Sequence, residues 1–144
     1  MRGLLTQEAI RLQLPSVSRD EAISQAGRLL VQKGYVNSSY IAAMFEREDQ
    51  VSTFIGRGVA IPHGSVQDPN LVHQSGIVLL QYPEGILYDG HICYIVIGIA
   101  SHADQHLEIL RHIALVLSNQ DILATLWTTN DVAWVVSLFE EGLT

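Results

Sequence analysis

The spacing of apolar residues changes twice along this chain of 144 residues, and this limits the fold more than any other feature. Before residue 50 they recur at helical spacing, behind a capping box at Ser18-Arg19-Asp20-Glu21 and ahead of a helix stop at Gly34. Between residues 51 and 100 they form short runs separated by turns that contain Gly or Pro, as buried strands do. Helical spacing then returns. This order excludes both a regular βαβ repeat and an all-β domain.

The same pattern predicts the individual elements. The predicted helices cover 19–33, a segment ending near residue 49 with Ile41, Met44 and Phe45 on one face, about 103–118, 121–127 and 131–139. The predicted strands cover 51–55, 59–61, 77–81 and 92–97, and residues 4–14 remain unassigned. We therefore expect a single α/β domain with a central mixed parallel and antiparallel sheet of about five strands, flanked by helices.

Charge and composition exclude several classes of protein. Residues 1–50 hold six acids and six bases, whereas residues 51–144 hold nine acids and only two bases, Arg57 and Arg111. This balance argues against a nucleic-acid binder, which needs a basic surface. The single cysteine, Cys93, excludes an internal disulfide and is expected to be an inert core residue. The strongly apolar stretch 94–100 is too short to span a membrane, and no signal-peptide core is present, so we expect a cytoplasmic domain.

His63 is the leading candidate for chemistry. It follows a predicted buried strand that ends at Pro62, and Gly64 follows it. Proline supplies no donor to a strand ladder, and glycine lets another surface approach closely. Histidine has a pKa near neutrality, so it can act as a neutral nucleophile. The alternative interpretation is an ordinary loop histidine beside a proline turn.

His106 is the second candidate, in the first turn of the predicted 103–118 helix. A helix N-terminus favours a nearby anion and disfavours the imidazolium form, so His106 would stay neutral and donate one hydrogen bond. It could instead be a satisfied histidine at the edge of the core. His102 lies four residues earlier and could share a metal with it, but no third ligand has a recognisable spacing. We therefore expect no metal site and, since no nucleotide or phosphate loop is present, no cofactor.

The remaining histidines and the arginines are less specific signals. His73, His91 and His112 are expected at the surface or in loops. Arg47 lies among three acids and is either a solvated ion-pair residue or a clamp for a phosphoryl group, whose oxygens guanidinium binds in a forked geometry. Arg57 could also bind a phosphoryl group, because it is close to His63 in sequence.

At this point the chain resembles a known family. Gly58-Val-Ala-Ile-Pro-His63-Gly64 resembles the phosphorylation-site motif of the mannitol/fructose class of enzyme IIA, domains of the bacterial phosphoenolpyruvate-dependent sugar phosphotransferase system. Gln105-His106-Leu107 is similar to the site of that family's second histidine, and Gln81-Tyr-Pro-Glu-Gly85 is similar to the mannitol branch. The resemblance covers nearly the whole chain, so residues 1–144 are expected to form one enzyme IIA domain. Such a domain would be either free-standing or part of a larger permease.

The resemblance implies a phosphoryl relay. His63 would accept a phosphoryl group on Nε2 from the phosphorylated carrier HPr and pass it to a cysteine of an enzyme IIB domain. That domain then phosphorylates mannitol or a related polyol or hexose during uptake. His106 would stabilise the phosphoryl group, and Arg47 matches the active-site arginine of the mannitol branch. Contact with the membrane would be indirect, through the permease.

Two further expectations accompany this hypothesis. The chain could instead be a regulatory module, similar to nitrogen-type IIA-like proteins or to IIA-like domains of transcription activators, in which phosphorylation of His63 controls partner binding. We also expect acids of the second half of the chain to rim the site and to meet a basic face on HPr, which would raise the encounter rate.

Overall fold

The computed structural model describes residues 3–65 and 70–141, so both ends of the predicted domain lie outside the described part. Its helical elements are a short 3-10 helix η1 (Gln7–Ala9), α1 (Arg19–Gln32), α2 (Tyr40–Gln50), α3 (His106–Val116), α4 (Gln120–Leu126) and α5 (Val132–Glu141). Its strands are β1 (Ile10–Arg11), β2 (Phe54–Gly56), β3 (Val59–Ala60), β4 (Gly76–Tyr88) and β5 (His91–Ala100). Among these described residues, no helix combines the length and the apolar character that crossing a bilayer requires.

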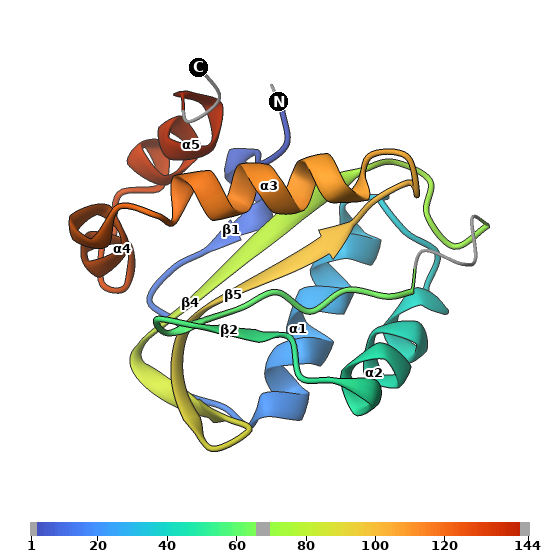
Figure 1. The fold of residues 1–144 in the computed structure, drawn as a ribbon, viewed down its shortest axis with the longest axis horizontal. Coiled ribbons are helices and arrows are strands. Elements are labelled where there is room, and N and C mark those ends of the chain that lie inside the picture. The colour runs from blue at the N-terminus through green and yellow to red at the C-terminus, as the bar shows by residue number, and fades with distance from the viewer. Residues whose placement is uncertain (1–2, 66–69, 142–144) are drawn as a thin grey trace.

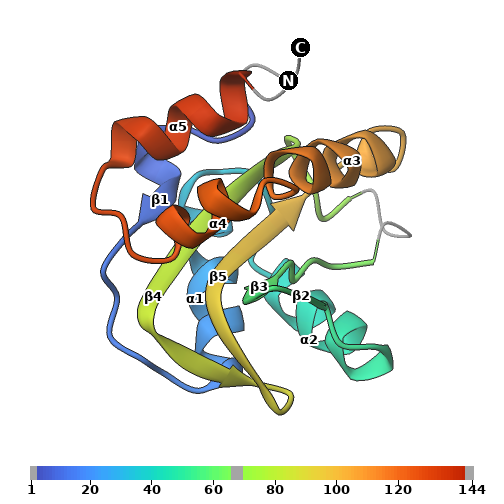
Figure 2. The ribbon, with the colours of Figure 1, turned by 60° about the vertical axis from the view of Figure 1, so that its left-hand side comes forward.

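The strands form one mixed sheet in the order β1-β4-β5-β3-β2. β1 runs parallel to β4 and β3 parallel to β5, whereas the β4–β5 and β2–β3 pairs are antiparallel. Helices α1 and α2 lie on one face of the sheet, and α3, α4 and α5 lie toward the other (Figure 1 and Figure 2). The prediction of a single α/β domain with a mixed sheet of about five strands is therefore confirmed.

The β4–β5 hairpin forms the centre of the sheet and is longer than predicted. Expected strands over 77–81 and 92–97 become strands of 13 and 10 residues. Pro83-Glu84-Gly85, which the sequence suggests as a break between strands, lies inside β4, where the pairing shifts register between Gln81 and Ile86. A bulge of this kind accommodates a proline because it interrupts the ladder of hydrogen bonds.

Two short strands depart from the sequence prediction for reasons outside their own residues. The strand predicted over 51–55 begins at Phe54, because Thr53 is tied back to helix α2 through hydrogen bonds to Glu48. The unassigned segment 4–14 contains the two-residue strand β1, and its Leu14 amide donates to the Gln81 carbonyl. A strand of two residues is too short for a periodic signal.

Helix α3 and its neighbour α5 also correct the sequence analysis. α3 begins at His106 and not near residue 103, so His102 lies outside the helix. His112, expected at the surface, is only 2% exposed, and its Nε2 lies 2.7 Å from the Phe139 carbonyl oxygen of α5. The periodicity of α3 alone could not reveal that α5 packs over this position. His73 and His91 are exposed, as predicted.

Candidate active site

The backbone of His63 is fixed at the end of the central sheet. His63 forms an isolated parallel bridge with Ile99 of β5, and the Ile99 amide donates to the Pro62 carbonyl. The buried hydroxyl of Tyr40, on α2, donates to the Ile99 carbonyl at 2.7 Å and accepts from the Gly64 amide at 2.8 Å. A Cβ on Gly64 would lie 2.7 Å from the Tyr40 ring, so the close approach requires glycine here. One hydroxyl thus joins α2, β5 and the segment that carries His63.

The hydrogen bond of the His63 ring determines its tautomer. Nδ1 lies 2.7 Å from the carbonyl oxygen of Ile61, which can only accept, so Nδ1 carries the proton and the lone pair is on Nε2. The His63 side chain is buried, with 8% of the residue exposed, and it lines an open pocket. Burial lowers the pKa of His63 to about 4, and the nearby His106 and Arg47 act in the same direction. The ring is therefore neutral at physiological pH, with an unprotonated Nε2 of the kind that can act as a nucleophile.

His106 faces His63 across the pocket from the first position of α3. The ring centroids are 5.0 Å apart, and the planes are tilted by 51°. The Nδ1 atom of His106 lies 2.7 Å from the Oγ of Ser101, which is buried at the end of β5. If the hydroxyl donates, Nε2 of His106 carries a proton that it can donate into the pocket. Burial and the Arg47 guanidinium lower the pKa of His106, which favours the neutral ring.

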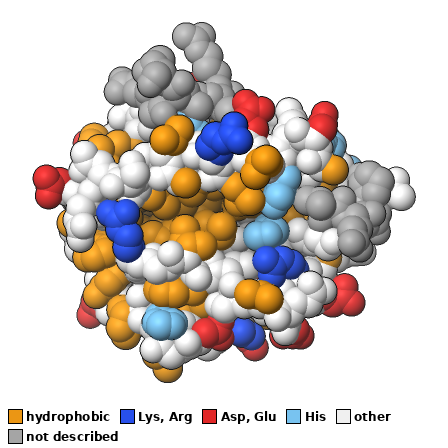
Figure 3. Space-filling view, in the orientation of Figure 1, with side chains coloured by type: hydrophobic (Ala, Val, Ile, Leu, Met, Phe, Trp, Pro, Cys, Tyr) orange, Lys and Arg blue, Asp and Glu red, His pale blue; other side chains and the backbone are white. Residues whose placement is uncertain are grey.

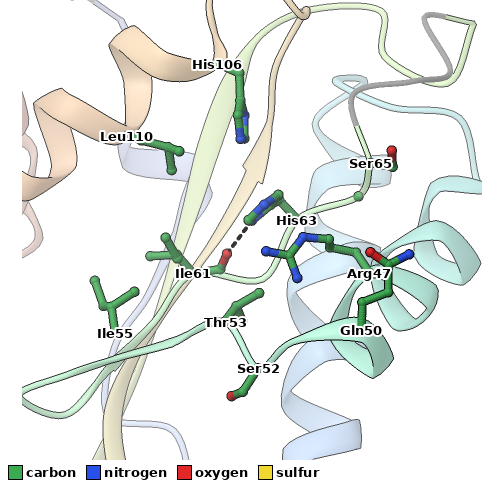
Figure 4. A pocket seen from close by; sticks show the side chains of 11 residues that line it. Arg47, Gln50, Ser52, Thr53, Ile55, Ile61, His63, Ser65, His106 and Leu110 are labelled. Atoms are coloured by element: carbon green, nitrogen blue, oxygen red, sulfur yellow. Dashed lines mark hydrogen bonds between the residues drawn. The ribbon is translucent and has the colours of Figure 1, made fainter.

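Arg47 is the third candidate side chain that lines the pocket. It lies in the last turn of α2, and its guanidinium points toward the His63 ring in Figure 4. Its Nη1 donates to the Val51 carbonyl at 2.8 Å. Despite three acidic neighbours in sequence, Arg47 forms no ion pair with any described residue. Glu48 turns inward instead, is 3% exposed, and accepts from the amide and hydroxyl of Thr53. The structure therefore does not support an ion pair of Arg47 with a described residue, and its role as a phosphoryl clamp stays a prediction.

The pocket around these side chains has a volume of about 410 Å³ and opens to solvent. His63, His106 and Arg47 converge on it from the end of the sheet, from α3 and from α2 (Figure 4). Neutral donors and one guanidinium around a nucleophilic nitrogen suit an anion that must be held and then released. The structure thus brings together the three residues that the sequence predicts for the site.

Two other candidates do not reach this pocket. Arg57 lines a separate cavity, and His102 lies in the turn before α3, so the two histidines proposed as a metal pair do not share a helix face. In the described part of the chain no three His, Cys, Asp or Glu side chains gather in a way that could hold a metal ion. Cys93 is fully buried, and burial raises its pKa to about 12, which confirms its assignment to the core.

The expected acidic rim is not found on the walls of the pocket. None of the described residues that line it is Asp or Glu. Figure 3 shows the histidines beside a field of apolar side chains with Lys or Arg at its edges, whereas the acids lie toward the outline of this face. Acids therefore do not form the described walls of the pocket, and an acidic rim around it that meets HPr stays a prediction. The excess of acids after residue 50 had indicated only their number.

The supporting residues of the site were not predicted from the sequence. Tyr40, Met44 and Glu48 are all buried and four residues apart, so they form one stripe of α2 that helical spacing could have revealed. A buried glutamate in such a stripe is itself a signal, because a carboxylate there needs hydrogen-bond donors. Ser101 offers no comparable signal, since its contact with His106 depends on how β5 meets α3.

The comparisons with known proteins agree with this geometry. The family model for "Phosphoenolpyruvate-dependent sugar phosphotransferase system, EIIA 2" matches residues 3–142. The mannitol-specific phosphotransferase enzyme IIA component of Bacillus subtilis is 39% identical over 139 residues, which are 96% of this chain and 97% of that protein. The mannitol-specific EIICBA component of Pasteurella multocida is 40% identical over 141 residues, but the chain spans only 23% of that protein's length.

Among solved structures, the complex of Escherichia coli enzyme IIA for mannitol with phosphorylated enzyme IIB is similar, with a TM-score of 0.88 and 33% identity. The match covers 95% of this chain and 99% of that chain. These likenesses place the protein in the class of phosphotransferase components that act in a phosphoryl relay. Within that class the chain belongs to the EIIA 2 family of the phosphoenolpyruvate-dependent sugar phosphotransferase system.

Proposed function

We propose that this chain is a cytoplasmic phosphocarrier of mannitol uptake, and that His63 is the residue that carries the phosphoryl group. The observation that supports this proposal most directly is the state of His63. Its Nδ1–H is held by the Ile61 carbonyl, its lowered pKa keeps Nε2 unprotonated, and His106 and Arg47 face the same pocket. The names of the relatives support mannitol as the sugar.

The proposed chemistry is an in-line transfer between two nitrogens. The Nε2 lone pair of His63 attacks the phosphorus of the phosphohistidine on HPr. As the new P–N bond forms, the bond to the donor nitrogen breaks and its electron pair stays on the donor imidazole. No proton needs to move, because Nδ1–H of His63 remains bonded to the Ile61 carbonyl. Such a step depends on positioning and on stabilising the charge of the phosphoryl oxygens.

His106 and Arg47 supply that stabilisation. The Nε2–H of neutral His106 and the guanidinium of Arg47 are the donors that face the equatorial oxygens of the transferring group. Because only one of the two is charged, the site holds the phosphoryl group without trapping it. In the second transfer His63 is the donor. A cysteine thiolate of an enzyme IIB domain attacks phosphorus, and the electron pair of the Nε2–P bond returns to His63.

The test is phosphorylation with labelled phosphoenolpyruvate, enzyme I and HPr, followed by mapping of the acid-labile phosphohistidine. We expect the label on His63, no label on His63→Ala, and normal labelling of His73→Ala, a matched control at an exposed loop histidine. His106→Ala and Arg47→Ala should remain phosphorylatable but transfer more slowly. Labelling of the His63→Ala variant would refute the proposal. Labelling of His63 without onward transfer to an enzyme IIB domain would favour the regulatory alternative.

A further inference from the structure

A groove separate from the phosphoryl pocket lies between helix α1 and strand β1, at one edge of the sheet. It has a volume of about 250 Å³, and none of its lining residues also lines the pocket of His63. Strand β1 has two residues whereas its neighbour β4 has 13, so the sheet ends early beside α1. The proposed phosphoryl relay makes no use of this groove.

Regular secondary structure brings the side chains of this groove together. Arg11 of β1 is the register partner of Leu80 of β4, so these two side chains project from the same face of the sheet. The residues that α1 contributes are three or four positions apart and therefore lie on one side of the helix: Gln25, Arg28, Leu29 and Gln32. The shape of the groove thus follows from the helix and the strands that build it.

The groove combines an apolar floor with polar groups that can donate hydrogen bonds. Leu29 is 5% exposed and Leu80 is 1% exposed, so the floor is formed by the buried core. The polar lining consists of two guanidinium groups and two carboxamides, and no described residue of the lining is Asp or Glu. Sites for small molecules have this composition, in which apolar side chains supply contact area and a few polar groups fix the orientation of the ligand.

Arg11 carries a positive charge that no acid of the described chain neutralises. Its Nη1 donates to the Glu8 carbonyl at 2.8 Å and to the Ile10 carbonyl at 3.0 Å, which restrains the guanidinium. Within residues 3–65 and 70–141 it forms no ion pair, and its Nε and Nη2 donate to no acceptor. Arg28, in contrast, is paired with Glu21 at 2.8 Å. The groove therefore offers one free positive charge, which matches a ligand of charge −1.

We infer that this groove is a binding site for a small aliphatic carboxylate. The carboxylate accepts two hydrogen bonds, from Nε and Nη2 of Arg11, and the aliphatic body of the ligand covers the leucine floor. The Gln32 amide, which forms no hydrogen bond with a described residue, is a further donor. A phosphate dianion suits the groove less well, because its second charge would need Arg28, which Glu21 already binds. The inference does not depend on the proposed function.

The test is a titration of the whole chain with hexanoate at pH 7, followed through its amide signals by nuclear magnetic resonance. We expect saturable shifts in α1 and β1, with a dissociation constant on the order of 1 mM for a ligand of this size. Hexan-1-ol has the same carbon chain without the charge and should bind at least tenfold more weakly. Inorganic phosphate should leave the signals of the groove in place. Hexanoate should also raise the midpoint of thermal unfolding, because it binds the folded protein.

Three variants locate the binding. Arg11→Gln removes the free charge and should weaken hexanoate at least tenfold. Gln32→Glu places a carboxylate at an exposed position of the groove, where it cannot disturb the core, and should weaken hexanoate at least fivefold by repulsion. Arg111→Gln is the matched control. It removes the same charge from an exposed site on α3, on the other face of the sheet, and should bind within twofold of wild type (Figure 1).

Three results would overturn the inference. The first is the absence of shifts in α1 and β1 at hexanoate concentrations on the order of 50 mM. The second is equal affinity for hexanoate and hexan-1-ol, or equal shifts with inorganic phosphate. The third is wild-type affinity for hexanoate in both Arg11→Gln and Gln32→Glu. None of these results bears on the phosphorylation of His63, which lies outside the groove.

Discussion

The lowered pKa of His63 makes a quantitative prediction about stability in acid. The folded protein holds this pKa at about 4, chiefly through burial, whereas in the unfolded chain it returns to the ordinary value of 6.5. Above pH 6.5 neither state binds a proton at His63, and the residue has no effect on the pH dependence. As the pH falls below 6.5, the unfolded chain takes up a proton that the folded protein does not, so unfolding becomes more favourable. The effect levels off below about pH 4.

The magnitude follows from the gap between the two pKa values. At about 1.4 kcal/mol per pH unit, lowering the pH from 7.5 to 4.5 costs roughly 2.5 kcal/mol of unfolding free energy at this one residue. Urea unfolding of wild type and His63→Gln at both pH values isolates the contribution, because the other titrating groups are common to the two proteins. We expect the wild type to lose about that much more stability than the variant.

Nuclear magnetic resonance can measure the pKa of His63 directly, by following the ring signals of His63 from pH 8 to pH 3. The midpoint should lie near 4, well below the ordinary value of 6.5. A midpoint above 6, or an equal loss of stability in wild type and His63→Gln, would refute the reasoning that burial keeps this imidazole neutral.

Four other substitutions test the supports of the site and the β2–β3 turn. Tyr40→Phe leaves the Gly64 amide and the Ile99 carbonyl without their partner and should cost about 2 kcal/mol in urea unfolding, with slower phosphorylation of His63. Ser101→Ala should slow transfer at His106 with less than about 1 kcal/mol change in stability, because among the described residues its hydroxyl bonds to that ring. Glu48→Ala removes the acceptor for Thr53 and should cost about 2 kcal/mol by the same measurement. Gly58→Ala should destabilise by about 1–3 kcal/mol, since its φ is +77° and the new Cβ meets Tyr94; an unchanged unfolding midpoint would contradict this.

Features encoded by neighbouring residues were predictable from the sequence. The Ser18 cap of α1 accepts from the Glu21 amide as the capping box indicates, and the Gly56-Arg57-Gly58 turn joins two strands as expected. The Pro62-His63-Gly64 motif also places a histidine at the end of a strand. These predictions hold because each rests on contacts between residues that are close in sequence.

Features that depend on distant partners were not predictable. Pro83 looks like a break in a strand, but β5 pairs on both sides of the bulge that contains it. His112 looks like a surface residue until α5 covers it. The count of acids shows that the second half of the chain is negatively charged. It does not show where those acids lie in the fold, and none of them is in the described wall of the pocket.

The position of Tyr40 and Arg47 on one helix has a mechanical consequence. The two residues are seven positions apart, so they lie on the same face of α2, about 10 Å along its axis. Tyr40 holds the backbone that carries His63, and Arg47 places its charge beside the His63 ring. Helix α2 therefore sets the distance between the backbone of His63 and the guanidinium of Arg47. Because Tyr40 and Arg47 both belong to one helix, a displacement of α2 would move the backbone of His63 and the charge of Arg47 together.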